Sequence, residues 1–246
     1  MMERATPGGR IRPIRNLRSL DSVELARVLR GASGTERDLA HRELLDRARL
    51  EGPRKIASLL GESAAFTPAA AEAQRLALLS QLEPSQETML LRALRFSSPR
   101  LRRFVLTLLE PRTPESRLRS PADEILALEE DPDPGVRFQL ALTLGEFRSP
   151  VAAQTLGRIA RRDAADPMMR AAILSSVLAE PAAFFEELRR GSWLSTGFRT
   201  TLEPFLVSLA GAGQAAGAGG LPSRVLADVA LRVFPDRKST RLNSSH

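Results

Sequence analysis

A short sequence pattern occurs twice between residues 131 and 176, and it constrains the fold more than any other feature of the chain. An Asp-Pro turn is followed by a hydrophobic residue and an arginine, and then by a helix of small and branched apolar residues. Arg137 and Arg170 hold equivalent places in the two copies, 33 residues apart. A self-similar period of this length is typical of helical solenoids, so the sequence predicts stacked helical repeats. An ordinary helical bundle with two similar helices is the alternative.

The turns explain how each copy begins. In both, an aspartate can accept a backbone N–H as the helix N-cap, and the following proline fills the first helical position, where a missing N–H costs nothing. In the first helix, Val136, Leu140 and Leu144 fall on one face. Phe138 and Leu142 lie on nearly the opposite face. A helix that is apolar on two sides is expected to be buried between neighbours, so the unit needs further copies beside it.

Dipeptides of Ser, Thr or Asp followed by Pro separate helices of about ten to fifteen residues along the chain. No stretch within residues 21–210 alternates apolar and polar residues as a strand would. The sequence therefore predicts an all-α superhelix, or solenoid, of about six helix pairs. Its first two helices are expected to be capped by Ser22 and Thr35. The Ser/Thr/Asp-Pro steps that mark helix starts are Thr67-Pro68, Ser98-Pro99, Ser120-Pro121, Asp133-Pro134, Ser149-Pro150 and Asp166-Pro167.

Composition divides the chain into four parts. Residues 1–20 are irregular and basic, and are interpreted either as the end of a missing upstream domain or as a disordered lead-in. Residues 21–210 carry the repeat array, interrupted by a linker rich in proline and arginine at 110–120. Residues 211–235 combine a flexible Gly/Ala linker with the start of a further helical unit. Residues 236–246 resemble translated sequencing-adapter DNA, so we expect a non-native tail on a fragment of a longer protein.

The net charge of +7 is concentrated at the two ends of the chain. Residues 1–20 carry +4 and residues 236–246 carry +2, which leaves +1 for residues 21–235. A surface that follows a phosphate backbone should be basic along its length, so we expect no nucleic-acid partner. No apolar run approaches the roughly 18 residues that span a bilayer. The absence of cysteine excludes disulfides, thiolate metal sites and a Cys-x-x-Cys-His haem attachment.

Few residues offer chemistry, and we predict no catalytic, cofactor-binding or metal-binding residue. There is no nucleophile elbow and no phosphate-binding loop. His41 is interpreted as a surface or groove residue, because a metal site needs further ligands nearby. An acidic cluster lacks the spacing and glycine of a calcium loop and is interpreted as helix caps and solvated charge. It consists of Glu129, Glu130, Asp131 and Asp133.

Arg102, Arg137 and Arg170 each follow a helix cap at a fixed offset. At such a position an arginine can bond the carboxylate or carbonyls of an adjacent turn, which favours a structural ladder over an anion-binding stripe. Aromatic residues near the end of the array are predicted to form a local core or cap, with a partner-docking patch as the alternative. They are Trp193, Phe184, Phe185 and Phe198.

Three segments carry a resemblance to one family, over about residues 10–210. DPDPGVRFQLALTLGEFRSPVAAQTLGRIARRDAADPMMRAAILSS resembles the HEAT-repeat region of large bacterial proteins known as membrane-bound dehydrogenases or PVC-type haem-binding proteins. RIRPIRNLRSLDSVELARVLRGASGTERDLAHRELLDR is similar to the junction between that family's β-propeller and its first helical repeat. QRLALLSQLEPSQETMLLRALRFSSPRLRRFVLTLLEP is similar to its middle repeats.

The resemblance implies a HEAT-like solenoid placed between a propeller and a cytochrome-c-like domain, in an exported or periplasmic bacterial protein. Neither haem binding nor dehydrogenase chemistry can be transferred, because the chain has no propeller and no cysteine. We expect a non-catalytic scaffold without a cofactor, which binds a protein partner or neighbouring domains of a redox parent. A helical-repeat nucleic-acid-binding or DNA-repair-type protein is the alternative. The oligomeric state and the parent's own activity stay open.

Overall fold

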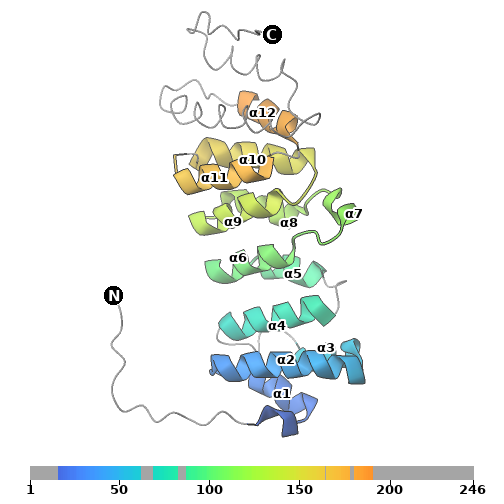
Figure 1. The fold of residues 1–246 in the computed structure, drawn as a ribbon. Helices are drawn as coiled ribbons and strands as arrows, with labels where there is room; N and C mark the ends of the chain where they lie inside the picture. Colours follow the sequence, from blue (N-terminus) through green and yellow to red (C-terminus); the bar gives the residue numbers. More distant parts are fainter. Residues whose placement is uncertain (1–15, 62–68, 83–86, 164, 178–179, 191–246) are drawn as a thin grey trace, which may run out of the picture. The chain divides into compact units, whose positions relative to one another are not determined.

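Every regular element that the structure describes is a helix, which confirms the predicted all-α class (Figure 1). The helices group into two compact units, residues 1–90 and residues 91–246. No helix in the described part is both long and apolar enough to cross a membrane. The computed structural model describes residues 16–61, 69–82, 87–163, 165–177 and 180–190.

The first unit is built around one long helix, α2. This helix packs against α1, α3 and α4, and the short η1 also contacts it. Leu25, Leu29, Leu44, Ile56 and Leu60 are completely buried and form the centre of this core. The bounds are η1 Leu17–Ser19, α1 Ser22–Leu29, α2 Gly34–Glu51, α3 Pro53–Leu60 and α4 Ala69–Leu82.

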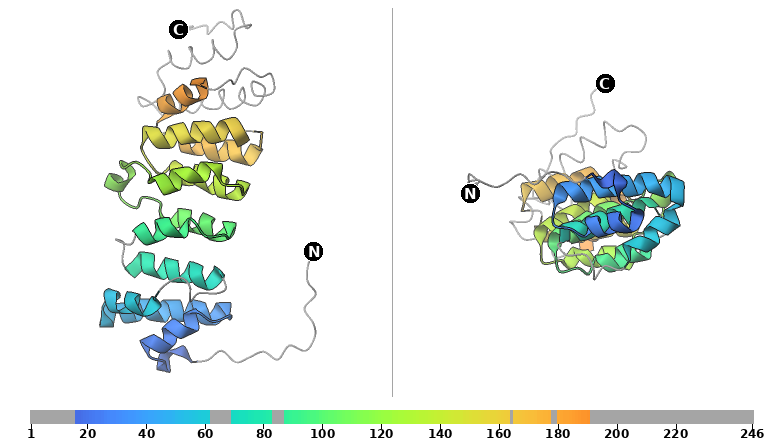
Figure 2. Two further views of the ribbon diagram at one scale, coloured as in Figure 1. Left: turned by 180° about the vertical axis from the view of Figure 1, so that it is seen from behind. Right: turned by 90° about the horizontal axis from the view of Figure 1, so that it is seen from below.

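The second unit is a row of helices in which α9 is central. It packs against α6 on one side and α11 on the other, while α10 packs on α12 (Figure 2). Each helix covers the apolar side of the next, as in a solenoid. The bounds are α6 Pro99–Leu108, α7 Pro114–Arg117, α8 Asp123–Leu126, η3 Ala127–Glu130, α9 Pro134–Leu144, α10 Pro150–Asp163, α11 Pro167–Ser176 and α12 Pro181–Arg190, with α5 Glu87–Ala93 at the unit boundary.

Twelve α-helices lie in the described residues. The short α7 is not one of the helices that pack against each other in the row, because it lies within the linker at 110–120. The sequence predicted an irregular linker here, but Thr113 and Ser116 form a capping box that supports one helical turn. The predicted segments 211–235 and 236–246 lie outside the described residues.

Three predicted helix starts were wrong by one or two residues. α8 begins at Asp123 with Ala122 as its N-cap, two residues after the predicted start at Ser120-Pro121. Asp21 caps α1 in place of Ser22, and its carboxylate accepts from the backbone N–H of Glu24 at 2.8 Å. Ser33 caps α2 in place of Thr35 and accepts from the backbone N–H of Glu36 at 3.3 Å. Both earlier residues adopt extended backbone, as an N-cap requires, whereas Ser22 and Thr35 are already helical.

The Asp-Pro starts of α9 and α11 are confirmed. Asp133 Oδ1 accepts from the N–H of Val136 at 3.0 Å, and Asp166 Oδ1 accepts from the N–H of Met168 at 2.7 Å. Pro134 and Pro167 occupy the first position of the two helices. The repeated turn therefore acts in the same way in both copies.

The helices α9 and α11 approach each other closely at Gly145, directly after α9. A Cβ atom at this position would lie 2.6 Å from the Cβ of Ser176 and 2.7 Å from its Cα. No real Cβ is found that close to another carbon. The α9–α11 contact therefore depends on glycine at this position.

Candidate functional site

A buried arginine on α6 joins the first helix of the row to the turn before α9. The Nη1 group of Arg102 donates to the carbonyl oxygens of Phe96, at 2.7 Å, and Ser97, at 3.1 Å. Its Nε and Nη2 groups donate to the two carboxylate oxygens of Asp131, at 2.7 and 2.8 Å. This bidentate geometry is the strongest form of an arginine–carboxylate pair. One side chain therefore fixes its own turn and the next one.

Arg137 repeats the arrangement one step further along the row. Its Nη1 donates to the carbonyl oxygen of Asp131 at 2.6 Å, and its Nε and Nη2 donate to the carboxylate of Asp163, each at 2.7 Å. The hydrogen bond to Asp163 raises the pKa of Arg137 above its ordinary value, so the side chain is always charged. Asp131 thus accepts hydrogen bonds from Arg102 through its carboxylate and from Arg137 through its backbone carbonyl. We call this continuous set of bonds the arginine ladder.

The predicted ladder is confirmed at Arg102 and Arg137, whose guanidinium groups are bonded within the fold. Arg170 makes the equivalent contact to its own turn, since its Nη1 donates to the carbonyl of Ala165 at 3.0 Å. The ladder accounts for these arginines as structural groups, so it favours that interpretation over an anion-binding stripe.

A fourth arginine of this type, in the first unit, was not predicted from the sequence. Arg37 is buried, and its Nη1 donates to the carbonyls of Gly31, at 2.8 Å, and Ala32, at 2.7 Å. Its Nε donates to the side-chain oxygen of Gln74 at 3.1 Å. Arg37 follows its cap Ser33 by four residues, the same offset as in the three predicted arginines. That offset would have identified it, had the cap been placed correctly.

The acidic cluster is held by neighbouring arginines. Glu129 pairs with Arg158 at 2.7 Å, and Glu130 pairs with Arg162 at 3.1 Å, which ties η3 to α10. The prediction of capping holds for Asp133, as described above. The prediction of solvated charge was wrong for Asp131, whose side chain is buried in the ladder because two repeats meet there. No group of metal-ligating side chains is present among the described residues.

His41 and Glu110 also have shifted pKa values. His41, on α2, is partly buried, and this burial lowers its pKa although the nearby Asp38 carboxylate opposes the shift. Glu110 follows α6, and burial raises its pKa although the hydroxyl of Thr143 donates to it at 3.0 Å. Both groups lie between neighbouring helices, so both report on packing.

The aromatic residues of α12 form a local core. Phe184 and Phe185 are buried, and their rings meet edge to face with centroids 5.5 Å apart. α12 packs on α10, so these rings close the described end of the row. The prediction of a core or cap is confirmed for these two residues. Trp193 and Phe198 lie outside the described residues.

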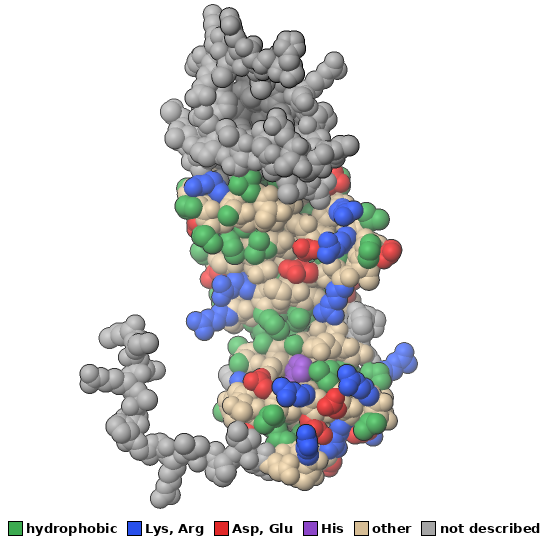
Figure 3. Space-filling view, viewed as in Figure 1, with side chains coloured by type: hydrophobic (Ala, Val, Ile, Leu, Met, Phe, Trp, Pro, Cys, Tyr) green, Lys and Arg blue, Asp and Glu red, His purple; other side chains and the backbone are tan. Residues whose placement is uncertain are grey.

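One face of the row is only partly covered, contrary to expectation. Val136, Leu140 and Leu144 are buried as predicted, but Phe138 and Leu142 are only partly covered. The two-sided burial predicted for α9 is therefore confirmed for one face and reached only in part on the other. Its second apolar face belongs to a surface on which hydrophobic side chains gather over α9 and α11 (Figure 3).

A comparison of equivalent positions would have revealed this partly covered face. Phe138 corresponds to Arg103 on α6 and to Ala171 on α11, at spacings of 35 and 33 residues. Leu142 corresponds to Thr107 and Ser175. A position in the apolar core would be apolar in every repeat, and these two positions are not. We call the solvent side of α6, α9 and α11 the outer face.

The comparison with protein families agrees with this architecture. Residues 87–177 match the HEAT repeats family. This part of the chain is a HEAT-repeat region. It contains the helices α5 to α11 and the whole arginine ladder from Arg102 to Asp163. No curated protein and no solved structure matches the chain.

Proposed function

We propose that the chain is a non-catalytic interaction scaffold within a larger bacterial redox protein of the dehydrogenase or cytochrome type. The observation that carries the scaffold role is the arginine ladder. Its buried charged groups bond to adjacent turns, so they hold successive helices in a fixed register. The row of helices therefore presents a surface of fixed shape to another molecule. HEAT repeats commonly act in this way, as scaffolds or interaction modules.

The redox context rests on the resemblance described for residues 10–210. In that family, helical repeats separate a propeller from a haem-binding domain, and a rigid spacer would hold the two apart at a constant distance. By the same resemblance we propose an exported, periplasmic location. The partners are then neighbouring domains of the same parent protein or a separate protein in that compartment.

The test of this context is the reading frame on the intact genomic contig. We expect a propeller-coding segment upstream, a Cys-x-x-Cys-His motif downstream, and a different sequence in place of DRKSTRLNSSH. An intact frame in which the repeats adjoin a nuclease, a glycosylase or another DNA-repair segment would contradict the proposal. The frame of residues 21–210 serves as the internal control, because it must be unchanged on the contig.

A further inference from the structure

The outer face combines apolar side chains on α9 and α11 with a basic end on α6. On α9, Phe138 and Leu142 lie on it, and on α11 it includes Met168, which is 64% exposed. Phe138 and Leu142 are partly buried, whereas Met168 is exposed. Apolar side chains placed together on a surface are typical of interaction sites. At the α6 end the face carries Arg100 and Arg103, both exposed.

The two parts of this face adjoin. A Cβ atom at Gly135 would lie 3.0 Å from the Nη1 of Arg103, so this arginine reaches across from α6 onto the start of α9. Phe138 and Leu142 follow Gly135 by three and seven residues, and such positions share one face of a helix. A single bound segment could therefore contact Arg103, Phe138 and Leu142 together.

The positive charge at this end is only partly balanced, because a Cβ at Gly135 would lie 3.0 Å from Asp133 Oδ1 as well as from Arg103 Nη1. No aspartate or glutamate occurs between Glu87 and Glu110 in the sequence. Neither Arg100 nor Arg103 forms an ion pair with a described residue. On α10 the situation is the opposite, because Arg158 and Arg162 pair with carboxylates of η3. The α6 end thus presents two exposed guanidinium groups to an external carboxylate, that of Arg100 and that of Arg103, which lies beside Asp133.

We propose that the outer face binds a polypeptide segment with apolar side chains on α9 and α11 and with carboxylates at Arg100 and Arg103. This proposal rests on the scaffold role and specifies its partner. A nucleic acid fits less well, because its phosphates continue along the surface. Beyond α6 they would meet the carboxylates of Asp133 and Asp166, the caps of the next two helices. Binding to a phosphate backbone needs several neutralised phosphates, not one basic end.

The test is a selection from a random 12-residue peptide display library against the full chain, followed by fluorescence anisotropy on the selected peptides. We expect enrichment of peptides with Asp or Glu at one end and Leu or Phe at the other. The double variant Arg100→Glu/Arg103→Glu is expected to weaken their binding at least about tenfold, because like charges would then face each other. Phe138→Ser should weaken it to a similar extent by removing an apolar anchor.

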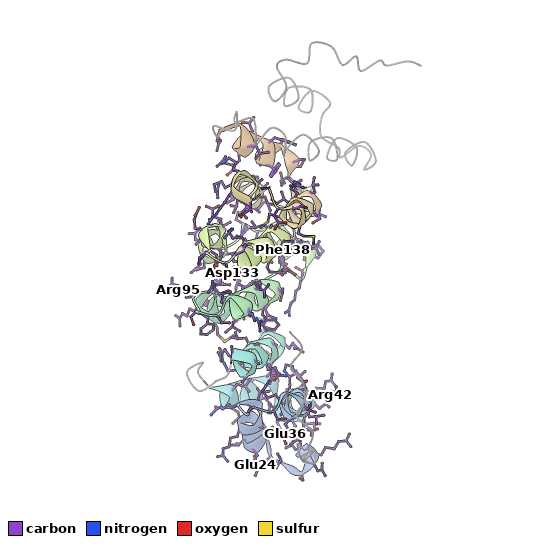
Figure 4. The ribbon with its side chains drawn as sticks, turned by 90° about the vertical axis from the view of Figure 1, so that its left-hand side faces the viewer. Glu24, Glu36, Arg42, Arg95, Asp133 and Phe138 are labelled. Carbon is purple, nitrogen blue, oxygen red and sulfur yellow. The ribbon has the colours of Figure 1, made fainter. Side chains whose placement is uncertain are left out.

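Arg95→Glu is the matched control. Arg95 is exposed and belongs to the same repeat, but it lies on a different side of the unit from Phe138 (Figure 4). This variant should retain affinity within about twofold, since its charge is distant from the peptide. Circular dichroism establishes that every variant is folded. Because the altered side chains are wholly or partly exposed, none of them is expected to unfold the chain.

Three results would overturn the proposal. Selected peptides could lack acidic residues, their binding could be indifferent to Arg100, Arg103 and Phe138, or a 20-base-pair DNA duplex could compete with them through the same arginines. Each would refute the partner class while leaving the genomic test of the redox context untouched. Conversely, a contig without propeller or haem motif would refute the parent protein and leave peptide binding as measured.

Discussion

Replacing Asp131 by asparagine tests whether the arginine ladder holds the row of helices together. The side chains of Arg102 and Asp131 are only 10% and 5% exposed. Asparagine keeps the shape of aspartate and one acceptor oxygen. Its amide group, however, takes the place of the second oxygen and points a donor at a guanidinium N–H. The buried cation of Arg102 then loses its counter-charge.

The expected cost follows from these contacts. A hydrogen bond to a charged group contributes roughly 1.5–3 kcal/mol, and breaking a buried ion pair costs about 3–5 kcal/mol. The carbonyl oxygens of Phe96 and Ser97 still accept hydrogen bonds from the guanidinium group of Arg102. The loss of stability should therefore lie at the lower end of the range for a broken ion pair. We expect Asp131→Asn to lower the free energy of unfolding of the second unit by about 3 kcal/mol.

Glu130→Gln is the matched control, one residue away. Glu130 pairs with Arg162, but the two side chains are 82% and 43% exposed. Exposed pairs contribute about 0–1 kcal/mol, so this variant should differ little from the parent chain. The free energies come from urea unfolding followed by circular dichroism. Hydrogen exchange measured on peptides from α6 and α9 shows whether the loss is located at the ladder.

A double variant shows how much of this cost comes from leaving one charge of the Arg102–Asp131 pair buried without its partner. Replacing both partners by apolar residues, as Arg102→Met with Asp131→Leu, should cost clearly less than the sum of the two single changes, since no buried charge is left unpaired. The reasoning is refuted if Asp131→Asn is no more destabilising than Glu130→Gln, or if the double change equals that sum.

Three further predictions concern packing and pH. Gly145→Ala should destabilise the chain by about 1–3 kcal/mol in urea unfolding, because α11 must move away, whereas Gly34→Ala, which meets no atom closer than 3.7 Å, should not. For His41 the folded pKa lies below 6.5, so stability should fall as pH drops through 6.5, and His41→Gln should abolish that part of the decline. For Glu110 the folded pKa lies above 4.5, so stability should fall as pH rises past 4.5, and Glu110→Gln should flatten that profile, measured by the urea midpoint between pH 4 and 7.

The repeated turn was the informative part of the sequence. Asp133 and Asp166, each followed by proline, predicted the starts of α9 and α11, because capping and proline at the first helical position are local effects. The shared offset of Arg102 and Arg137 predicted the ladder for the same reason. The caps at Asp21 and Ser33 were missed because several neighbouring residues can cap, and only the backbone conformation selects one.

The sequence by itself determined the helical class, the repeat period and the place of the ladder arginines, since these follow from spacing and turn chemistry along one chain. Only the tertiary structure decided which carboxylates the arginines reach, because Asp131 and Asp163 come from other helices. It also decided that Phe138 is only partly buried. Hydrophobicity shows which side chains gain from burial, but whether a neighbour covers them depends on how the helices stack.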